Sequence, residues 1–419
     1  MLGKLLRIGL IAGYILLSGC SKSSTSKPDS PQGFAVTAGD GQVVVTWNQV
    51  ADVQYWLFLA EGTVISLNDY FNQPGARVIT PAYSPQIVNG LLNGTSYAFL
   101  MNATQNGGPA GATTASLAAT PRLAGGTWST ATGLTNSLPT GINFEGIAYG
   151  GGGIFVAVGQ GGAIYTGYYS GVGQIIWGPQ TSNFTFGDLH GVVWTGALFV
   201  AVGDGGYVDY SADGVTWFVV NAGTNNALRA VTTGNGYYIV VGDAGTIAVS
   251  TQLSTGTWTV QNPTAQNLVG ASLLLPGYIF VLGANGTLLV STDGVTWSTP
   301  PGLPAVAATL RAASWGTAAP TPLVAIVGDN GTLITSPDIV NYTLQAKPAG
   351  SSANLLSLWY GSRFVTVGTG GTILYSDDGI NWTVPATVSP AIAQNLNGVT
   401  YGNGDYVTVG DGGANAQSN

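Results

Sequence analysis

A short strand followed by a Gly-x-x-Gly turn recurs from residue 154 onward, and this repeat constrains the fold more than any other feature. Successive first glycines lie 39 to 45 residues apart: Gly159, Gly203, Gly242, Gly283, Gly328, Gly368 and Gly410. Each unit reads as four short strands joined by tight turns. A regular period of about 40 residues with four strands per unit predicts the blades of a β-propeller.

Outer aromatic strands mark the units and indicate how the ring closes. Six units carry an aromatic residue 14 to 18 positions after the first glycine: Trp177, Trp217, Trp258, Trp297, Tyr342 and Trp382. The seventh unit stops before one, whereas Trp128 lies ahead of the first unit and belongs to none. We therefore predict seven blades over residues 123–419, with residues 123–130 supplying the outer strand of the last blade. This shared blade removes exposed sheet edges.

The composition agrees with an all-β chain. Glycine is abundant, at 64 of 419 residues, and a charged fraction of only 7% with 45% hydrophobic residues argues against disorder. The net charge is −8, and residues 1–19 hold two of the positive charges. An acidic chain with few lysines and arginines predicts no nucleic-acid partner. We expect a monomer.

Residues 31–122 resemble a fibronectin type III domain. Leu91 lies six residues before Tyr97, and apolar residues alternate from Tyr97 to Ala103, as around that family's corner tyrosine. Trp47, at the end of a valine-rich strand, matches the family's core tryptophan. The resemblance implies a two-sheet sandwich of seven strands. Because no charged cluster marks a site here, we expect this β-sandwich to be a spacer.

The N-terminus has the features of a bacterial lipoprotein signal peptide. Lys4 and Arg7 precede an apolar stretch over residues 8–17, which is too short to span a bilayer comfortably. Leu17-Ser18-Gly19-Cys20 resembles a lipobox. The resemblance implies removal of residues 1–19, lipidation of Cys20 and a tether over residues 20–30. We expect a protein of the cell envelope anchored to a membrane through lipid, with Ser21 favouring the outer membrane.

Three acidic turns resemble the Asp-box of sialidase-like propellers, although they are one residue shorter than the common form. Their aspartates are Asp213, Asp293 and Asp378, each followed by glycine and, four residues on, by tryptophan. An aspartate in a tight turn can accept backbone N–H bonds, and the glycine supplies unusual backbone angles. We expect these aspartates to be structural, on hairpins away from any catalytic mouth, rather than metal ligands.

The sequence offers little support for catalysis. Sialidase chemistry requires an arginine triad, and the repeats contain three arginines, but Arg363 lies at the opposite end of its blade from Arg229 and Arg311. His190 is the only histidine, and no nucleophile motif, cofactor loop or Cys/His metal set accompanies it. We therefore predict no enzyme, no cofactor and no metal. A sialidase-like glycan hydrolase is the alternative.

Rare polar residues share one repeat position, just after the residue that opens each inner strand. In chain order, these positions hold Glu145, His190, Arg229, Val269, Arg311, Leu356 and Asn397. The turn after the second strand should reach the same face, and there the repeats offer Asp204, Asp243, Asp329 and Asp411. One mouth of the propeller should therefore carry a polar ring. Either its arginines pair with neighbouring aspartates and lock blades together, or the ring binds an anionic ligand, a sugar or a partner's chain end.

The repeats also resemble the seven-bladed assembly factors of photosystem II. These proteins share the leucine-arginine strand start, the glycine turn and the trailing tryptophan. The resemblance implies binding of a partner polypeptide rather than catalysis. Three hypotheses follow: a binding scaffold for a protein or carbohydrate, a glycan-active enzyme, and a purely structural envelope protein.

Overall fold

A computed structural model describes residues 27–105, 110–130, 137–169, 174–254, 257–274, 277–317, 322–347 and 352–418. Over these residues the chain is all-β, with strands joined by turns and 3-10 helices of three residues. No helix there is long and apolar enough to cross a bilayer. The predicted signal peptide, Cys20 and most of the tether lie outside the described residues.

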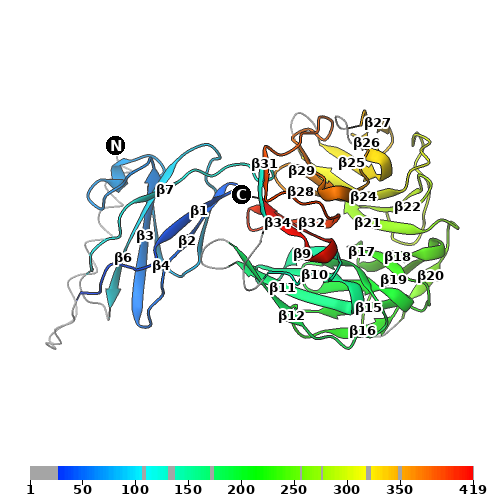
Figure 1. The fold of residues 1–419 in the computed structure, drawn as a ribbon, viewed down its shortest axis with the longest axis horizontal. Helices are drawn as coiled ribbons and strands as arrows, with labels where there is room; N and C mark the ends of the chain where they lie inside the picture. The colour runs from blue at the N-terminus through cyan, green and yellow to red at the C-terminus, as the bar shows by residue number, and fades with distance from the viewer. Residues whose placement is uncertain are drawn as a thin grey trace.

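The N-terminal unit consists of two antiparallel sheets (Figure 1). One sheet holds β1 (Ala35–Gly39), β2 (Gln42–Thr46) and β5 (Gln86–Asn89). The other holds β4 (Arg77–Ala82), β3 (Val53–Glu61), β6 (Tyr97–Gln105) and β7 (Leu117–Ala119), with η1 (Tyr70–Asn72) between β3 and β4. Trp47, Tyr97, Phe99 and Met101 are buried in the core between the sheets. Alternate residues of β6 therefore face this core, as the sequence pattern predicts.

Beyond residue 143 the described strands form seven sheets arranged around a common centre (Figure 1). The first three sheets run from the centre outward as β9 (Phe144–Gly150), β10 (Ile154–Gly159), β11 (Ala163–Tyr169) and β12 (Ile175–Gln180); β13 (Leu189–Trp194), β14 (Phe199–Gly203), β15 (Tyr207–Ser211) and β16 (Phe218–Asn221); and β17 (Leu228–Gly234), β18 (Tyr237–Gly242), β19 (Ile247–Ser250) and β20 (Thr259–Gln261).

The next three sheets follow the same order, and two of them have a single β-bridge in place of a fourth strand. They are β21 (Leu268–Leu274), β22 (Tyr278–Gly283) and β23 (Leu288–Ser291); β24 (Leu310–Gly316), β25 (Leu323–Gly328), β26 (Leu333–Ser336) and β27 (Thr343–Leu344); and β28 (Leu355–Tyr360), β29 (Phe364–Gly368) and β30 (Ile373–Ser376).

The last sheet joins distant parts of the chain. It holds β32 (Leu396–Gly402), β33 (Asp405–Gly410), β34 (Asn415–Ser418), β8 (Thr127–Thr130) and β31 (Thr387–Ser389). Strand β8 pairs antiparallel with β34, so residues ahead of the first repeat complete the last one. The sequence predicted β8 to be the outermost strand of this sheet. This prediction is wrong, because β31 pairs in parallel with the other edge of β8. Each inner strand packs beside the next and β32 packs beside β9, so the ring is continuous.

Short 3-10 turns follow the second strand in six of the seven sheets: η2 (Gln160–Gly162), η3 (Asp204–Gly206), η4 (Asp243–Gly245), η5 (Asp329–Gly331), η6 (Thr369–Gly371) and η7 (Asp411–Gly413). The middle residue of each turn has a positive φ, from 54° to 67°. Glycine adopts this conformation without strain, and it occupies four of the six places.

Side-chain bonds tie these turns to the next sheet. The N–H of Gly412 in η7 donates to Asn143 Oδ1 at 2.9 Å, which joins the last sheet to the first. The same bond, at 2.8 to 3.0 Å, recurs at four other boundaries, with acceptors Asp188, Asn267, Asn354 and Asn395. Each of these five acceptors lies two positions before the ring position of its own sheet. They fix the turns relative to the inner strands, and the repeat pattern did not predict them.

Candidate functional site

The acidic turns carry local structure. Asp213 Oδ1 accepts the backbone N–H of Val215 at 2.8 Å and of Thr216 at 2.7 Å, between β15 and β16. Those bonds hold the pKa of Asp213 down to about 2. The Nε1–H of Trp217 donates to Gly214 O at 3.0 Å, and this bond fixes the orientation of the buried indole. Asp293 and Asp378 accept the equivalent N–H bonds. The carboxylates therefore hold their own hairpins.

A fourth turn of this kind escaped the sequence analysis. Asp338 accepts the N–H groups of Val340 at 2.9 Å and Asn341 at 2.7 Å, as the three predicted aspartates do. Ile339 replaces the glycine and takes a φ of 67°. Tyr342 replaces the tryptophan. The serine two residues before each aspartate, here Ser336, is the signal that identifies the motif despite these replacements.

The polar ring lines a cavity of about 580 Å³ at one mouth of the central channel. Its walls are the first residues of the inner strands and the adjoining turns: Asn143, Glu145, His190, Arg229, Asp243, Asn267, Val269, Arg311, Leu356, Asn395, Asn397 and Asp411. We call this cavity the polar mouth. It brings together all five predicted inner-strand residues. Asp204 and Asp329 reach it through bonds to His190 and Arg311.

Each polar ring residue except Glu145 bonds to the aspartate in the turn of its own sheet. Arg229 Nη2 lies 2.8 Å from Asp243 Oδ2, and Arg311 Nη2 lies 3.0 Å from Asp329 Oδ2; both pairs are bidentate. Asn397 Nδ2 donates to Asp411 Oδ1 at 2.8 Å. Where the ring residue is apolar, at Val269 and Leu356, the turn lacks aspartate as well. The arginines thus pair within one sheet, which corrects the expectation that they lock neighbouring blades through aspartate.

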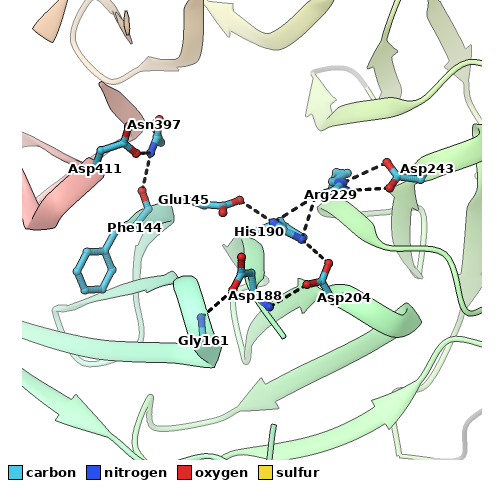
Figure 2. Close-up of polar contacts among 10 residues, drawn as sticks. All are labelled: Phe144, Glu145, Gly161, Asp188, His190, Asp204, Arg229, Asp243, Asn397 and Asp411. Atoms are coloured by element: carbon cyan, nitrogen blue, oxygen red, sulfur yellow. Dashed lines mark hydrogen bonds and ion pairs between the residues drawn. The ribbon is translucent and has the colours of Figure 1, made fainter. Parts of the chain in front are cut away.

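His190 joins neighbouring sheets through its side chain, as Asn397 does by donating to Phe144 O at 2.9 Å (Figure 2). The Nδ1 of His190 lies 2.6 Å from Glu145 Oε2 on β9, and its Nε2 lies 2.9 Å from Asp204 Oδ1 in its own sheet. Arg229 Nη1 on β17 lies 3.0 Å from Nε2. Burial alone lowers the pKa of His190, but the bonds to Glu145 and Asp204 outweigh it and raise that pKa. A carboxylate at each ring nitrogen favours the doubly protonated imidazole, whereas the charge of the neighbouring Arg229 opposes it.

These bonds decide the electrostatics of the polar mouth. Five carboxylates, on Glu145, Asp204, Asp243, Asp329 and Asp411, face two guanidinium groups and one imidazole ring. Both arginines are neutralised by bidentate aspartates. The mouth is therefore not a general anion site. Arg311 Nη1 has no hydrogen bond among the described residues, so its N–H groups are left as donors for a ligand.

Arg363 lies elsewhere and does not complete an arginine triad. Its Nη2 lies 2.7 Å from Asp377 Oδ1, and its guanidinium carbon lies 4.3 Å from the centre of the Tyr375 ring. The side chain is buried against β30 and does not line the polar mouth. Among the described residues, no three His, Cys, Asp or Glu side chains converge as a metal-binding group.

Solved structures resemble this arrangement of sheets. YCF48 bound to a D1 peptide matches with a TM-score of 0.53 at 18% identity, over 67% of this chain and 93% of that one. YCF48 from Cyanidioschyzon merolae gives 0.52 at 15% identity, over 70% and 98%. The WD40 domain of Doa1 gives 0.53 at 12%, over 68% and 95%. The repeated part of this chain has a β-propeller fold. No family model and no curated protein matches the sequence.

Proposed function

We propose that this chain is a non-catalytic binding scaffold whose propeller holds a polypeptide partner at the polar mouth. In this proposal the seven sheets are blades, the β8-containing sheet closes the ring, and the N-terminal unit is a fibronectin type III spacer. The observation that carries the proposal is a preformed cavity of about 580 Å³ whose polar side chains are fixed by mutual bonds. Preorganisation of this kind favours binding because little side-chain entropy is lost.

The chemistry of the polar mouth fits a peptide segment better than a simple anion. It offers the free Nη1 of Arg311, the second oxygen of Glu145 and the apolar side chains of Val269 and Leu356. A peptide presents donors, acceptors and apolar groups together, whereas an anion would meet a majority of carboxylates. The structurally similar YCF48 has been solved with a D1 peptide, which supports the same mode of use here.

Substitution of Arg311 tests this function. We expect Arg311→Ala to lose a partner that the full-length wild-type protein recovers from its own envelope extract, because it removes the N–H groups of Nη1, which no described residue engages. Arg77→Ala is the matched control, since Arg77 is exposed on the N-terminal unit. Quantitative mass spectrometry compares the three baits. Equal recovery of every partner by all three contradicts a site at the polar mouth.

We also propose that Cys20 anchors the protein by lipid in the cell envelope, at the outer membrane. The lipobox resemblance and the absence of any other cysteine support this. Labelled palmitate should be incorporated into the wild-type protein and not into Cys20→Ser; equal labelling of both rules the anchor out.

A sialidase-like hydrolase has less support, because Glu145 is bonded to His190 and Arg363 lies apart from the other arginines. A purely structural protein is the outcome if no ring substitution alters binding.

A further inference from the structure

A second cavity lies at the other end of the central channel. It has a volume of about 380 Å³ and is lined by the last residues of five inner strands, β13, β17, β21, β24 and β28. The polar mouth is lined by the first residues of inner strands, so the two cavities lie at opposite ends. A smaller cavity, of about 180 Å³, shares Arg229 with the polar mouth and Trp359 with the second cavity. We call the second cavity the aromatic mouth.

The aromatic mouth differs from the polar mouth in chemistry. None of the side chains that line it is charged. Three tryptophans and a tyrosine lie beside four hydroxyl-bearing residues: Trp194, Trp315, Trp359, Tyr360, Thr232, Thr233, Ser272 and Ser314. Pockets for small ligands combine apolar and aromatic walls with a few polar groups in this way. A ligand here gains nothing from net charge.

Trp359 breaks the repeat pattern at its position. It lies three residues after the polar ring position of its inner strand, and the other six inner strands hold smaller residues there: Ala148, Val193, Thr232, Ser272, Ser314 and Thr400. Thr232, Ser272 and Ser314 line the same cavity, so this position faces the channel on neighbouring strands. Because six sheets form without a tryptophan here, the scaffold does not require one.

Trp359 is also unusually exposed. Its relative exposure is 40%, whereas Trp128, Trp177 and Trp217 are 2 to 4% exposed. The next residue, Tyr360, has a packing role, because its ring lies 4.8 Å from that of Phe364 and against Gly316. Trp359 has no ring partner among the described residues. Leaving an indole in water inside a cavity forgoes hydrophobic stabilisation, which a ligand covering it would recover.

We propose that the aromatic mouth binds a neutral saccharide, with one sugar ring stacked on the indole of Trp359. A pyranose has an apolar face of C–H groups and an edge of hydroxyls. The indole supplies a flat apolar surface, and the hydroxyls of Thr232, Ser272 and Ser314 can each donate and accept a hydrogen bond. Ser314 Oγ accepts the N–H of Tyr360 at 3.1 Å and keeps its own proton to donate. An apolar peptide side chain would leave this row of hydroxyls without partners.

Calorimetric titration of the full chain tests this site with four probes: cellotetraose, chitotriose, oligogalacturonate and an apolar hexapeptide. We expect a neutral oligosaccharide to bind and Trp359→Ser to weaken that binding by at least about tenfold, since the stacking surface is lost. Trp359→Phe should bind with intermediate affinity. Serine is the residue that two other repeats carry at this position, so the variant should fold.

Arg311→Ala is the control, because Arg311 lines the polar mouth and not the aromatic mouth. It should leave saccharide binding unchanged, whatever it does to polypeptide binding. The proposal is overturned if neither neutral probe binds, if Trp359→Ser binds as wild type does, or if only the hexapeptide or the charged oligomer depends on Trp359.

Discussion

Replacement of Trp128 by alanine should lower the free energy of unfolding of the propeller by about 3–5 kcal/mol, the usual cost of removing a large buried aromatic side chain. Trp128 is 2% exposed and packs with Tyr406 at a ring distance of 6.5 Å. Its Nε1–H donates to Gly125 O at 3.0 Å. Deletion of residues 123–130 should have a larger effect, because it also leaves β34 and β31 with unpaired edges.

Thermal and urea denaturation measure both variants, with Trp359→Ser as the matched control. That variant also removes an indole, but an exposed one, so its stability should stay within about 0.5 kcal/mol of wild type. If Trp128→Ala has the same melting temperature as the wild type, β8 does not stabilise the closed ring. The closing-blade proposal would then be wrong.

Replacement of His190 by glutamine should destabilise the protein by about 2 kcal/mol at pH 6, because Glu145 and Asp204 lose their shared cation. The full cost of breaking a buried ion pair is larger, but the side chains of Glu145 and Asp204 are 34% and 36% exposed and therefore screened by water. Since the pKa of His190 is raised in the folded state, its contribution is complete below the ordinary value of 6.5. The contribution should fade as the pH rises through the raised value.

Urea denaturation between pH 6 and pH 9 measures this difference, which should shrink toward the alkaline end. Asn397→Ala is the control. Asn397 occupies the same ring position and also bonds to the aspartate of its own sheet, but its amide does not titrate in this range. The effect of Asn397→Ala on the free energy of unfolding should therefore be the same at pH 6 and at pH 9. A His190→Gln difference that is constant or grows with pH contradicts the proposed role of the imidazolium.

The repeated units were predictable because each one is a local pattern. The Gly-x-x-Gly turns and the strands around them recur with the expected order in all seven sheets. The turn at Asp338 was not predicted from the local pattern. This turn forms the same bonds as the turn at Asp213, but Ile339 and Tyr342 in place of glycine and tryptophan obscured the motif. The outer strand β31 was missed because it is three residues long and pairs with a segment far away in sequence.

The partners within the polar mouth were less predictable. The sequence identified the ring positions, since rare polar residues shared one place in the repeat. It did not tell whether Arg229 bonds to Asp243 of its own sheet or to Asp204 of the preceding sheet, because the repeat pattern places both turns at the same mouth. The turn geometry decides this: each aspartate begins a 3-10 turn beside the inner strand of its own sheet.

The sequence by itself determined the all-β class, the repeat and the residues at the polar mouth, because these follow from short-range periodicity and turn chemistry. Only the tertiary structure decided which side chains are left for a ligand. The ring places His190 between two carboxylates and leaves Trp359 uncovered at the opposite mouth. The partners of His190 and the exposure of Trp359 both depend on side chains from neighbouring sheets, which compete for the same contacts. That competition has no signature within a single repeat.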